Sequence, residues 1–361
     1  MIRCRNCGTP FPFPDFPYCC PRCGGLFGFV NGLRFASKDI KPDLPGIWRY
    51  RSSFSVPKGA PILTLGEGNT PLIWGEAFQK KIGFKLESLN PTGSFKDRGS
   101  AVLVSWLLAA GIQEAVEDSS GNAGASFAAY ASRAGIQGKV FIPDYASGPK
   151  RNQIESYGAK VIPVPGPRSK AAAAVLEEAS RGTAYASHAY LPHGTAGIAT
   201  IAYELVEELG AAPGTILVPV GHGSLLLGIW LGFQALRESG SIAGLPKMIG
   251  IQAGACAPLF KASQDSQNKP SPVSERKTLA EGVAIAEPFH GVSVLEAVRN
   301  SQGFFLQVKE DRIREGQKAL ASQGIYAEMT SALIWDGLRQ LPEEIPQPVV
   351  CIITGHGLKS I

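Results

Sequence analysis

Residues 215–238 read TILVPVGHGSLLLGIWLGFQALRE, an apolar run followed by a glycine-containing turn and a longer apolar segment. The first six residues have the length and composition of a buried strand, whereas residues 224–238 are long enough for a helix. Glycines at 221 and 223 mark the turn between them. The stretch therefore predicts a strand, a turn and a helix in succession.

Similar strand–turn–helix patterns recur from about residue 60 to the end of the sequence. Short apolar runs at residues 85–89, 139–143, 160–164, 183–187, 247–253 and 348–354 read as strands, with helical segments between most of them. Alternation of this kind predicts an α/β fold with mostly parallel sheets and helices on both faces. We expect one body over residues 61–361, with two doubly wound lobes. A smaller lobe, about 97–195, would be nested in a larger lobe formed by 61–96 and 196–361.

Composition excludes several classes of function. The chain has 361 residues, of which 44% are hydrophobic and 18% charged, so it can bury a large core. Its net charge of +5 is diffuse, without a Lys/Arg-rich block, which gives no support for a nucleic-acid partner. The first residues lack the apolar core of a signal peptide, and no apolar run reaches the length of about 18 residues that spans a membrane. We expect a cytoplasmic protein.

Five of the seven cysteines lie within the first 23 residues. Two Cys-x-x-Cys pairs, Cys4 with Cys7 and Cys20 with Cys23, are spaced to place four thiolates around one tetrahedral Zn²⁺. Cys19 is an alternative to Cys20, but only Cys20 keeps the two-residue spacing. Residues 1–35 are therefore expected to form a zinc ribbon, and 36–60 a connecting arm. The alternative is a redox or vestigial pair that holds no metal.

Residues 87–102, ESLNPTGSFKDRGSAV, set one lysine at the junction of a polar turn and a helix. A lysine held near apolar and aromatic groups has a depressed pKa, and only the neutral amine attacks a carbonyl carbon. Lys96, which directly follows Phe95, is therefore a candidate nucleophile. An ordinary structural lysine is the alternative.

Three further turns combine glycine with hydroxyl or amide groups. Residues 119–130, SSGNAGASFAAY, open a helix whose N-terminus suits a carboxylate or phosphate, although a simple N-cap explains most of the pattern. The turn at 221–224 precedes a second expected helix, so its backbone amides would lie at that helix's N-terminus. Thr354 ends the last strand before Gly355-His356-Gly357 and offers a hydroxyl either to a bound ring or as an N-cap. In open parallel sheets, ligands bind at such strand ends.

Taken together, these turns resemble those of the fold-type II pyridoxal-phosphate enzymes, and within them of the threonine synthases. NPTGSFKDR (90–98) is similar to the family's Schiff-base lysine motif, SSGNAGAS (119–126) to its substrate-carboxylate loop and TGHGLK (354–359) to its C-terminal signature. The resemblance covers residues 60–361 in the same order, and a cysteine ribbon also precedes some members. It implies a tryptophan-synthase-β-like fold, pyridoxal 5′-phosphate as cofactor and, by default, a homodimer.

The resemblance also implies a role for each matching residue. Lys96 would form the Schiff base and move protons at the α-carbon and its neighbour. Thr354 would face the pyridine nitrogen, where a neutral hydroxyl leaves the nitrogen largely unprotonated. The cofactor contacts would be Phe95, Lys96, Asn122, Gly221, His222, Gly223, Ser224, Leu225 and Thr354. The substrate contacts would be Ser119, Ser120, Gly121, Asn122 and His188. The implied reaction converts O-phospho-L-homoserine and water to L-threonine and phosphate.

One segment departs from the family pattern. Where the family has NSxNPYRxEGQKT, with its Asn, Ser and Arg on the substrate phosphate, residues 188–200 read HAYLPHGTAGIAT. His188 stands for the Asn and Gly194 for the Arg, so the forked cation suited to phosphate is missing. Either histidine of the segment, Lys150 or Arg151 would have to compensate; alternatively, both histidines only pack or lie at the surface.

This departure keeps two other functions open. One is an ammonia-lyase or β-replacement enzyme acting on serine, threonine, phosphoserine or a similar amino acid, such as a cysteate-synthase-like activity. Phosphate release from O-phosphohomoserine, as against ammonia or ketoacid from serine or threonine, distinguishes it from a threonine synthase. The other is a catalytically silent binding module, against which the intact Lys96, Asn122 and Thr354 argue.

Overall fold

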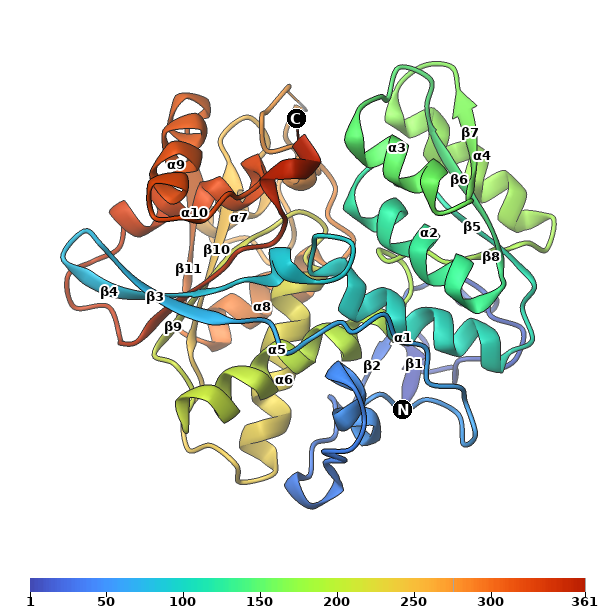
Figure 1. Ribbon diagram of the computed structural model, residues 1–361, viewed down its shortest axis with the longest axis horizontal. Coiled ribbons are helices and arrows are strands. Elements are labelled where there is room, and N and C mark those ends of the chain that lie inside the picture. The colour runs from blue at the N-terminus through green and yellow to red at the C-terminus, as the bar shows by residue number, and fades with distance from the viewer. Residues whose placement is uncertain (275, 361) are drawn as a thin grey trace. The chain divides into compact units, whose positions relative to one another are not determined.

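A computed structural model describes residues 1–274 and 276–360, and the C-terminal residue of the expected body, 361, lies outside it. The chain divides into two compact units. Unit 1 comprises Met1–Gly68 and Asn90–Ile198, and unit 2 comprises Asn69–Leu89 and 199–360 (Figure 1). Within the described residues, no helix combines the length and apolar character needed to cross a bilayer.

Unit 1 is built on a four-stranded sheet in the order β7-β6-β5-β8, with every neighbouring pair parallel. Its strands are β5 (Glu114–Glu117), β6 (Gln137–Pro143), β7 (Lys160–Val164) and β8 (Ala184–Tyr185). The helices between and before them are α1 (Lys96–Ala109), α2 (Asn122–Ala134), α3 (Pro149–Ser156) and α4 (Arg168–Ser180). Helix α5 (His193–Leu209) begins in this unit and ends in unit 2.

The N-terminal ribbon and the following arm also belong to unit 1. Strands β1 (Ile2–Cys4) and β2 (Phe27–Phe29) pair antiparallel. The arm contains two 3-10 helices, η1 (Ser37–Asp39) and η2 (Gly46–Ser53). Trp48 of η2 is fully buried, and its indole N–H donates to the carbonyl of Leu63 at 2.9 Å. This buried bond attaches the arm to the unit.

Unit 2 is built on a six-stranded sheet in the order β11-β10-β9-β12-β4-β3. Its strands are β3 (Leu72–Ala77), β4 (Lys80–Lys85), β9 (Thr215–Pro219), β10 (Lys247–Ala253), β11 (Phe304–Val308) and β12 (Val349–Ile352). The α-helices are α6 (Ser224–Glu238), α7 (Pro258–Gln264), α8 (Gly291–Asn300), α9 (Glu310–Ser322) and α10 (Met329–Arg339). Three 3-10 helices complete it: η3 (Glu87–Leu89), η4 (Glu281–Val283) and η5 (Gly357–Ser360). All strand pairs are parallel except β3 with β4.

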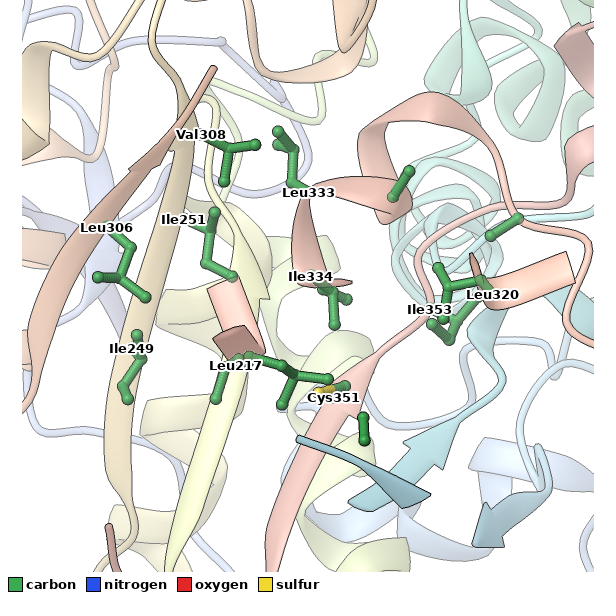
Figure 2. Packing of buried hydrophobic residues seen from close by; sticks show 14 of the residues in the cluster. Leu217, Ile249, Ile251, Leu306, Val308, Leu320, Leu333, Ile334, Cys351 and Ile353 are labelled. Atoms are coloured by element: carbon green, nitrogen blue, oxygen red, sulfur yellow. The ribbon is translucent and has the colours of Figure 1, made fainter. Parts of the chain in front are cut away.

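The core of unit 2 lies between its sheet and helix α10 (Figure 2). Leu217, Ile249 and Ile251 from neighbouring parallel strands pack with Leu333 and Ile334 of α10. Successive strand residues point to opposite faces, and the alternating residues Ile216, Val218 and Met248 are also fully buried. Both faces of the sheet are therefore covered, as the apolar runs predict for a parallel sheet.

The predicted α/β fold with mostly parallel sheets is confirmed, but the strand expected at 85–89 was wrong. The strand is β4, which ends at Lys85, and Glu87–Leu89 form a 3-10 helix. Here the Glu87 carboxylate accepts the Thr70 hydroxyl at 2.7 Å, and the Ser88 amide donates to the carbonyl of Ile353 at 2.9 Å. These bonds take the chain out of the sheet before the polar turn that follows.

Candidate functional site

The turn before Lys96 is held by one buried carboxylate. Asp97 accepts the Thr92 amide at 2.7 Å, the Thr92 hydroxyl at 2.6 Å and the Ser126 hydroxyl at 2.6 Å. Gly93 adopts a φ of 83°, which a residue with a side chain rarely takes, and its amide closes the turn on Asn90 at 2.8 Å. Asp97 therefore ties this turn to helix α2 and fixes the start of α1.

Lys96 is the first residue of α1, and its side chain is only partly buried. Its Nζ lies 4.8 Å from the centroid of the Phe95 ring. Another lysine, Lys85, is fully buried, but it donates to the carbonyl of Thr70 at 2.6 Å and pairs with Glu204 at 3.2 Å. Because the Lys85 ammonium is held in the core by an ion pair and a hydrogen bond, this lysine has a structural role. Lys96 is therefore the better candidate nucleophile.

The turn over residues 119–121 precedes α2, and Asn122 is the first residue of that helix. The Ser119 hydroxyl accepts the Gly121 amide at 3.2 Å, while Ser120 and Gly121 are partly exposed. A Cβ on Gly124 would lie 1.9 Å from the carbonyl oxygen of Ser119. The turn thus folds closely over the first turn of the helix. The N-terminus of α2 is the kind of site that can bind an anion.

Sequence reasoning missed the acid that ends β5, an inner strand of the sheet in unit 1. Glu117 at the end of β5 is buried, and its carboxylate lies 2.8 Å from His188 Nδ1 and accepts the Asp118 amide at 2.9 Å. Burial raises the pKa of Glu117 to about 7, against the charges of Lys96 and Arg168. Burial, followed by the Lys96 charge, lowers the pKa of His188. The predicted substrate residue His188 is thus partly buried and paired with a buried acid within the electrostatic reach of Lys96.

Two other residues of the departing segment, His193 and Gly194, are packing residues. His193 is fully buried, with ring centroids 4.6 Å from Phe11, 4.9 Å from Phe16 and 4.6 Å from Trp106. A Cβ on Gly194 would lie 3.2 Å from the Cα and carbonyl oxygen of Gly99 in helix α1. Helix α5 therefore packs closely on α1, and a side chain at position 194 would begin in a tight contact with Gly99. Of the proposed substitutes for the arginine, His193 is excluded by its burial among aromatic rings.

In unit 2, the predicted phosphate turn leads into α6. Gly223 has a φ of 100°, and a Cβ on it would meet Val294 at 2.4 Å. The His222 ring stacks on Phe289 with centroids 4.8 Å apart, and Ser224 and Leu225 begin the buried first turn of α6. This turn has the glycine conformation and the helix N-terminus that a phosphate site requires.

Thr354, also in unit 2, follows β12 and is buried in a hydrogen-bonded network. Its hydroxyl lies 2.8 Å from the hydroxyl of Ser331 and 3.1 Å from a carboxylate oxygen of Glu328. The backbone amides of Thr354 and Gly355 both donate to Ser331, at 2.9 and 3.2 Å. Glu328 and Ser331, neither of which the sequence reasoning singled out, therefore fix the position of Thr354.

The four cysteines selected by their spacing lie together in the ribbon. The sulfurs of Cys4, Cys7, Cys20 and Cys23 are all within 4.8 Å of one another, and Cys19 is outside the cluster. The amides of Gly8 and Gly24 fold back onto the carbonyls of Cys4 and Cys20, at 3.0 and 2.8 Å. This is the arrangement of two knuckles around a tetrahedral metal site.

A mostly parallel α/β fold with a lysine at one helix start and glycine-containing turns before other helices is compatible with the class of enzymes that use a phosphorylated carbonyl cofactor. Residues 63–355 match the family described as pyridoxal-phosphate dependent enzymes, and the chain belongs to that family. The predicted family membership is confirmed.

Two curated relatives and one solved structure are similar to the chain. The threonine synthase of Methanocaldococcus jannaschii is 35% identical over 100% of this chain and 93% of its own. The threonine synthase of Synechocystis sp. is 36% identical over 86% of this chain and 82% of its own. The structure of maize serine racemase has a TM-score of 0.69 at 20% identity, covering 80% of this chain and 88% of that one. This last likeness shows the fold alone.

Proposed function

We propose that the chain is a threonine synthase, a pyridoxal-phosphate-dependent lyase that converts O-phospho-L-homoserine and water to L-threonine and phosphate. The observation that carries the proposal is the 35% identity, over the full length of this chain, to a curated threonine synthase. The turns at 90–98, 119–126 and 354–359 support it, because they supply the residue types that this chemistry needs.

The described residues fit the cofactor on two observations. Among the residues that the structure describes, the buried Ser94 hydroxyl, two positions before Lys96, has no hydrogen-bond partner. The turn at 221–224 adopts a glycine conformation and leaves the first amides of α6 for a phosphate. When bound, pyridoxal phosphate supplies an aldehyde for an amine and a ring that accepts electrons from the substrate.

The chain's own residues would then bind and move protons. Lys96 would bind the cofactor and carry protons at two adjacent carbons of the substrate. Ser119, Ser120, Gly121 and Asn122 would hold the substrate carboxylate at the start of α2. The proposed cofactor contacts besides Lys96 are Phe95, Asn122, Gly221, His222, Gly223, Ser224, Leu225 and Thr354.

His188 is proposed as a further substrate residue. Its bond to Glu117 at 2.8 Å orients the imidazole, and the charge of Lys96 acts on both members of the pair. Because burial and the charge of Lys96 lower its pKa, this imidazole is neutral near pH 7 and would interact with a substrate oxygen through a hydrogen bond. Thus His188 would assist the leaving phosphate where the family uses an amide and a guanidinium.

A second candidate, an ammonia-lyase or β-replacement enzyme, is favoured by one observation. The backbone of Gly194 packs against Gly99, so any side chain at this position, including a phosphate-binding arginine, would begin in a tight contact. Of the two functions, the threonine synthase is the one that the full-length similarity supports.

The deciding experiment supplies the purified protein with O-phosphohomoserine, O-phosphoserine, threonine or serine and follows the products and the absorption spectrum. Phosphate and threonine from O-phosphohomoserine are expected. Ammonia or ketoacid from serine or threonine, without phosphate release, would establish the second candidate. Lys96→Ala should abolish both turnover and the visible band of the bound cofactor. Lys81→Ala, at a lysine on β4 of unit 2, is the matched control and should change neither.

We also propose that the four cysteines of the ribbon bind a structural Zn²⁺ and that the enzyme is a cytoplasmic homodimer acting on a small amino acid. The clustered sulfurs support the metal. The division into lobes at 97–195, and into 61–96 with 196–361, stays a prediction, as does the extent of the arm at 36–60.

A further inference from the structure

His188, the proposed substrate residue, lies on a short turn that closes on one serine. The buried Ser187 hydroxyl accepts the amides of Ala189 and Tyr190, both at 3.3 Å. The Ser187 carbonyl accepts the amide of Leu191 at 3.0 Å. These bonds make the turn compact, so a displacement of Tyr190 would also displace His188.

This turn is flanked by aromatic residues that contact the N-terminal ribbon. The contacts come from residues 8–19, the segment between the two cysteine knuckles, which we call the ribbon loop. The ring centroid of Tyr18 lies 5.6 Å from that of Tyr185, the last residue of β8, and 5.3 Å from that of Tyr190. Tyr18 also packs against the hydrophobic cluster that contains Tyr185. The ribbon loop therefore contacts the chain just before His188 and again within its turn.

A second contact with the ribbon loop lies after the turn, at the start of α5. The His193 ring stacks on Phe16, with centroids 4.9 Å apart and an interplanar angle of 25°, and its centroid lies 4.6 Å from that of Phe11. Among the described residues, neither nitrogen of the His193 ring has a hydrogen-bond partner. Packing on the ribbon loop and on Trp106 therefore holds this side chain.

The ribbon loop is itself firmly held. Phe16 is buried and has a φ of 58°, a left-handed conformation that a bulky residue keeps only when its surroundings impose it. At the start of the loop, the Cys4 amide donates to the carbonyl of Thr9 at 2.8 Å. Just after its end, the Cys20 amide donates to the carbonyl of Gly25 at 2.9 Å. Both ends of the loop are therefore fixed by the knuckles.

The contact at Tyr185 also reaches the acid that pairs with His188. The Tyr185 hydroxyl donates to the Asp118 carboxylate at 2.7 Å, and the Asp118 amide donates to the Glu117 carboxylate at 2.9 Å. That second carboxylate lies 2.8 Å from His188 Nδ1. The ribbon loop is thus connected to both members of the Glu117–His188 pair.

We propose that the ribbon is a positioning element for the reaction, in which Phe16 and Tyr18 hold the turn that carries His188 and so fix how the imidazole meets the substrate phosphate. This inference rests on the proposed function, in which His188 contacts that phosphate. An element that only stabilised the chain could pack anywhere on unit 1, whereas the ribbon loop packs on both sides of His188. Such positioning matters because a displacement of about 1 Å can cost on the order of 100-fold in rate.

The first test observes His188 directly in the full-length protein supplied with pyridoxal phosphate. The histidine ring nitrogens are labelled with ¹⁵N, and the signal of His188 is assigned by its loss in His188→Gln. Tyr18→Leu, which removes the ring but keeps an apolar side chain, should shift or broaden this signal. Tyr18→Phe, which keeps the ring, should leave the native signal. The signal of His356, in unit 2, should not move in either variant.

Two further variants separate this contact from packing in general. Phe13→Leu changes an exposed ring of the same loop, 5.7 Å from Trp106, and should leave the His188 signal unchanged. Phe11→Leu, at the contact with the start of α5, should change the signal and provides the test if Tyr18→Leu does not fold. An unchanged His188 signal in both Tyr18→Leu and Phe11→Leu overturns the proposal. An equal change in Phe13→Leu also overturns it.

A double-mutant cycle then measures whether the loop acts through His188. Tyr18→Leu should lower kcat/KM for O-phosphohomoserine roughly tenfold, the loss expected when a hydrogen bond to a charged group is misaligned. In the His188→Gln background the same change should lower kcat/KM by less than about twofold, because the interaction that it disturbs is already gone. Equal losses in the two backgrounds would show a general effect on unit 1 and would overturn the proposal.

The two readouts separate this inference from the proposed function. If no threonine forms from O-phosphohomoserine but the His188 signal responds to Tyr18→Leu, the proposed function fails and the positioning of His188 by the ribbon stands. If threonine forms and the His188 signal does not respond, the proposed function stands and the positioning role fails.

Discussion

Replacing His193 with phenylalanine tests whether the buried imidazole makes unit 1 sensitive to acid. His193 is fully buried among the rings of Phe11, Phe16 and Trp106, and among the described residues neither ring nitrogen has a hydrogen-bond partner. Burial alone lowers its pKa from 6.5 to about 3. In the folded protein the His193 imidazole therefore stays neutral down to about pH 3, whereas in the unfolded chain it becomes protonated below about pH 6.5.

The sign and size of the effect follow from this difference. Between pH 6.5 and about 3 the unfolded state binds one more proton at this residue, so the free energy of unfolding falls as the pH falls. Each pH unit is worth about 1.36 kcal/mol, which gives a loss of up to about 5 kcal/mol across the whole window. His193→Phe removes the titrating group but keeps an aromatic ring in the cluster, so it should remove this part of the loss.

The measurement is urea unfolding of both proteins at several pH values between 7 and 4, followed by tryptophan fluorescence. Trp106 is a local reporter, because its ring centroid lies 4.6 Å from that of His193. The variant should gain stability relative to the native protein by about 1.4 kcal/mol for each unit below pH 6.5. His193→Leu, which also cannot titrate, should show the same pH dependence. Parallel curves for the native and variant proteins would refute the reasoning.

Three other predictions concern buried or closely packed groups. Burial raises the pKa of Glu117 from 4.5 to about 7, so the free energy of unfolding falls as the pH rises through that window. Glu117→Gln cannot titrate and should avoid this loss. In the same unfolding assay, its free energy of unfolding should gain up to about 3 kcal/mol relative to the native protein between pH 5 and pH 8. Gly124→Ala places a Cβ 1.9 Å from the Ser119 carbonyl and should cost at least about 1–3 kcal/mol, whereas Gly244→Ala, which has no atom within 4 Å of its Cβ, should be nearly neutral. Zinc, measured by elemental analysis, should be retained by Cys19→Ser and lost by Cys23→Ser; equal retention would contradict the four-cysteine site.

The sequence predicted the parallel parts of the fold well, because buried strands and glycine-marked turns leave local signals. It missed the hairpin of β3 and β4, whose turn falls at Phe78 and Gln79. Both residues have a positive φ, 51° and 60°, a conformation that a sequence normally marks with glycine or asparagine. With neither residue type present, pairing in the sheet is what holds the turn, and that information is not local.

The candidate site divides in the same way. Lys96, Asn122 and the glycine turns were found because their chemistry is tied to short motifs at the ends of strands and the starts of helices. Glu117 and Glu328 were missed because an acid next to a polar turn normally lies in solvent. Their burial depends on tertiary packing: β5 is an inner strand between β6 and β8, and Gly355 makes room for the Glu328 carboxylate. Buried acids that contact a predicted site residue, as Glu117 and Glu328 do, can be recognised only when the fold brings distant segments together.

The same distinction explains why the substrate is harder to predict than the reaction. The absence of an arginine at position 194 was visible in the sequence, but its structural reason was not. Gly194 of α5 and Gly99 of α1 face each other. A Cβ built on either glycine would lie 3.2–3.5 Å from the nearest backbone atoms of the other. Such an approach favours packing at position 194, so under the proposed function a group that recognises the leaving phosphate would come from another element. His188, 2.8 Å from Glu117 and within the field of Lys96, is the residue proposed for this role.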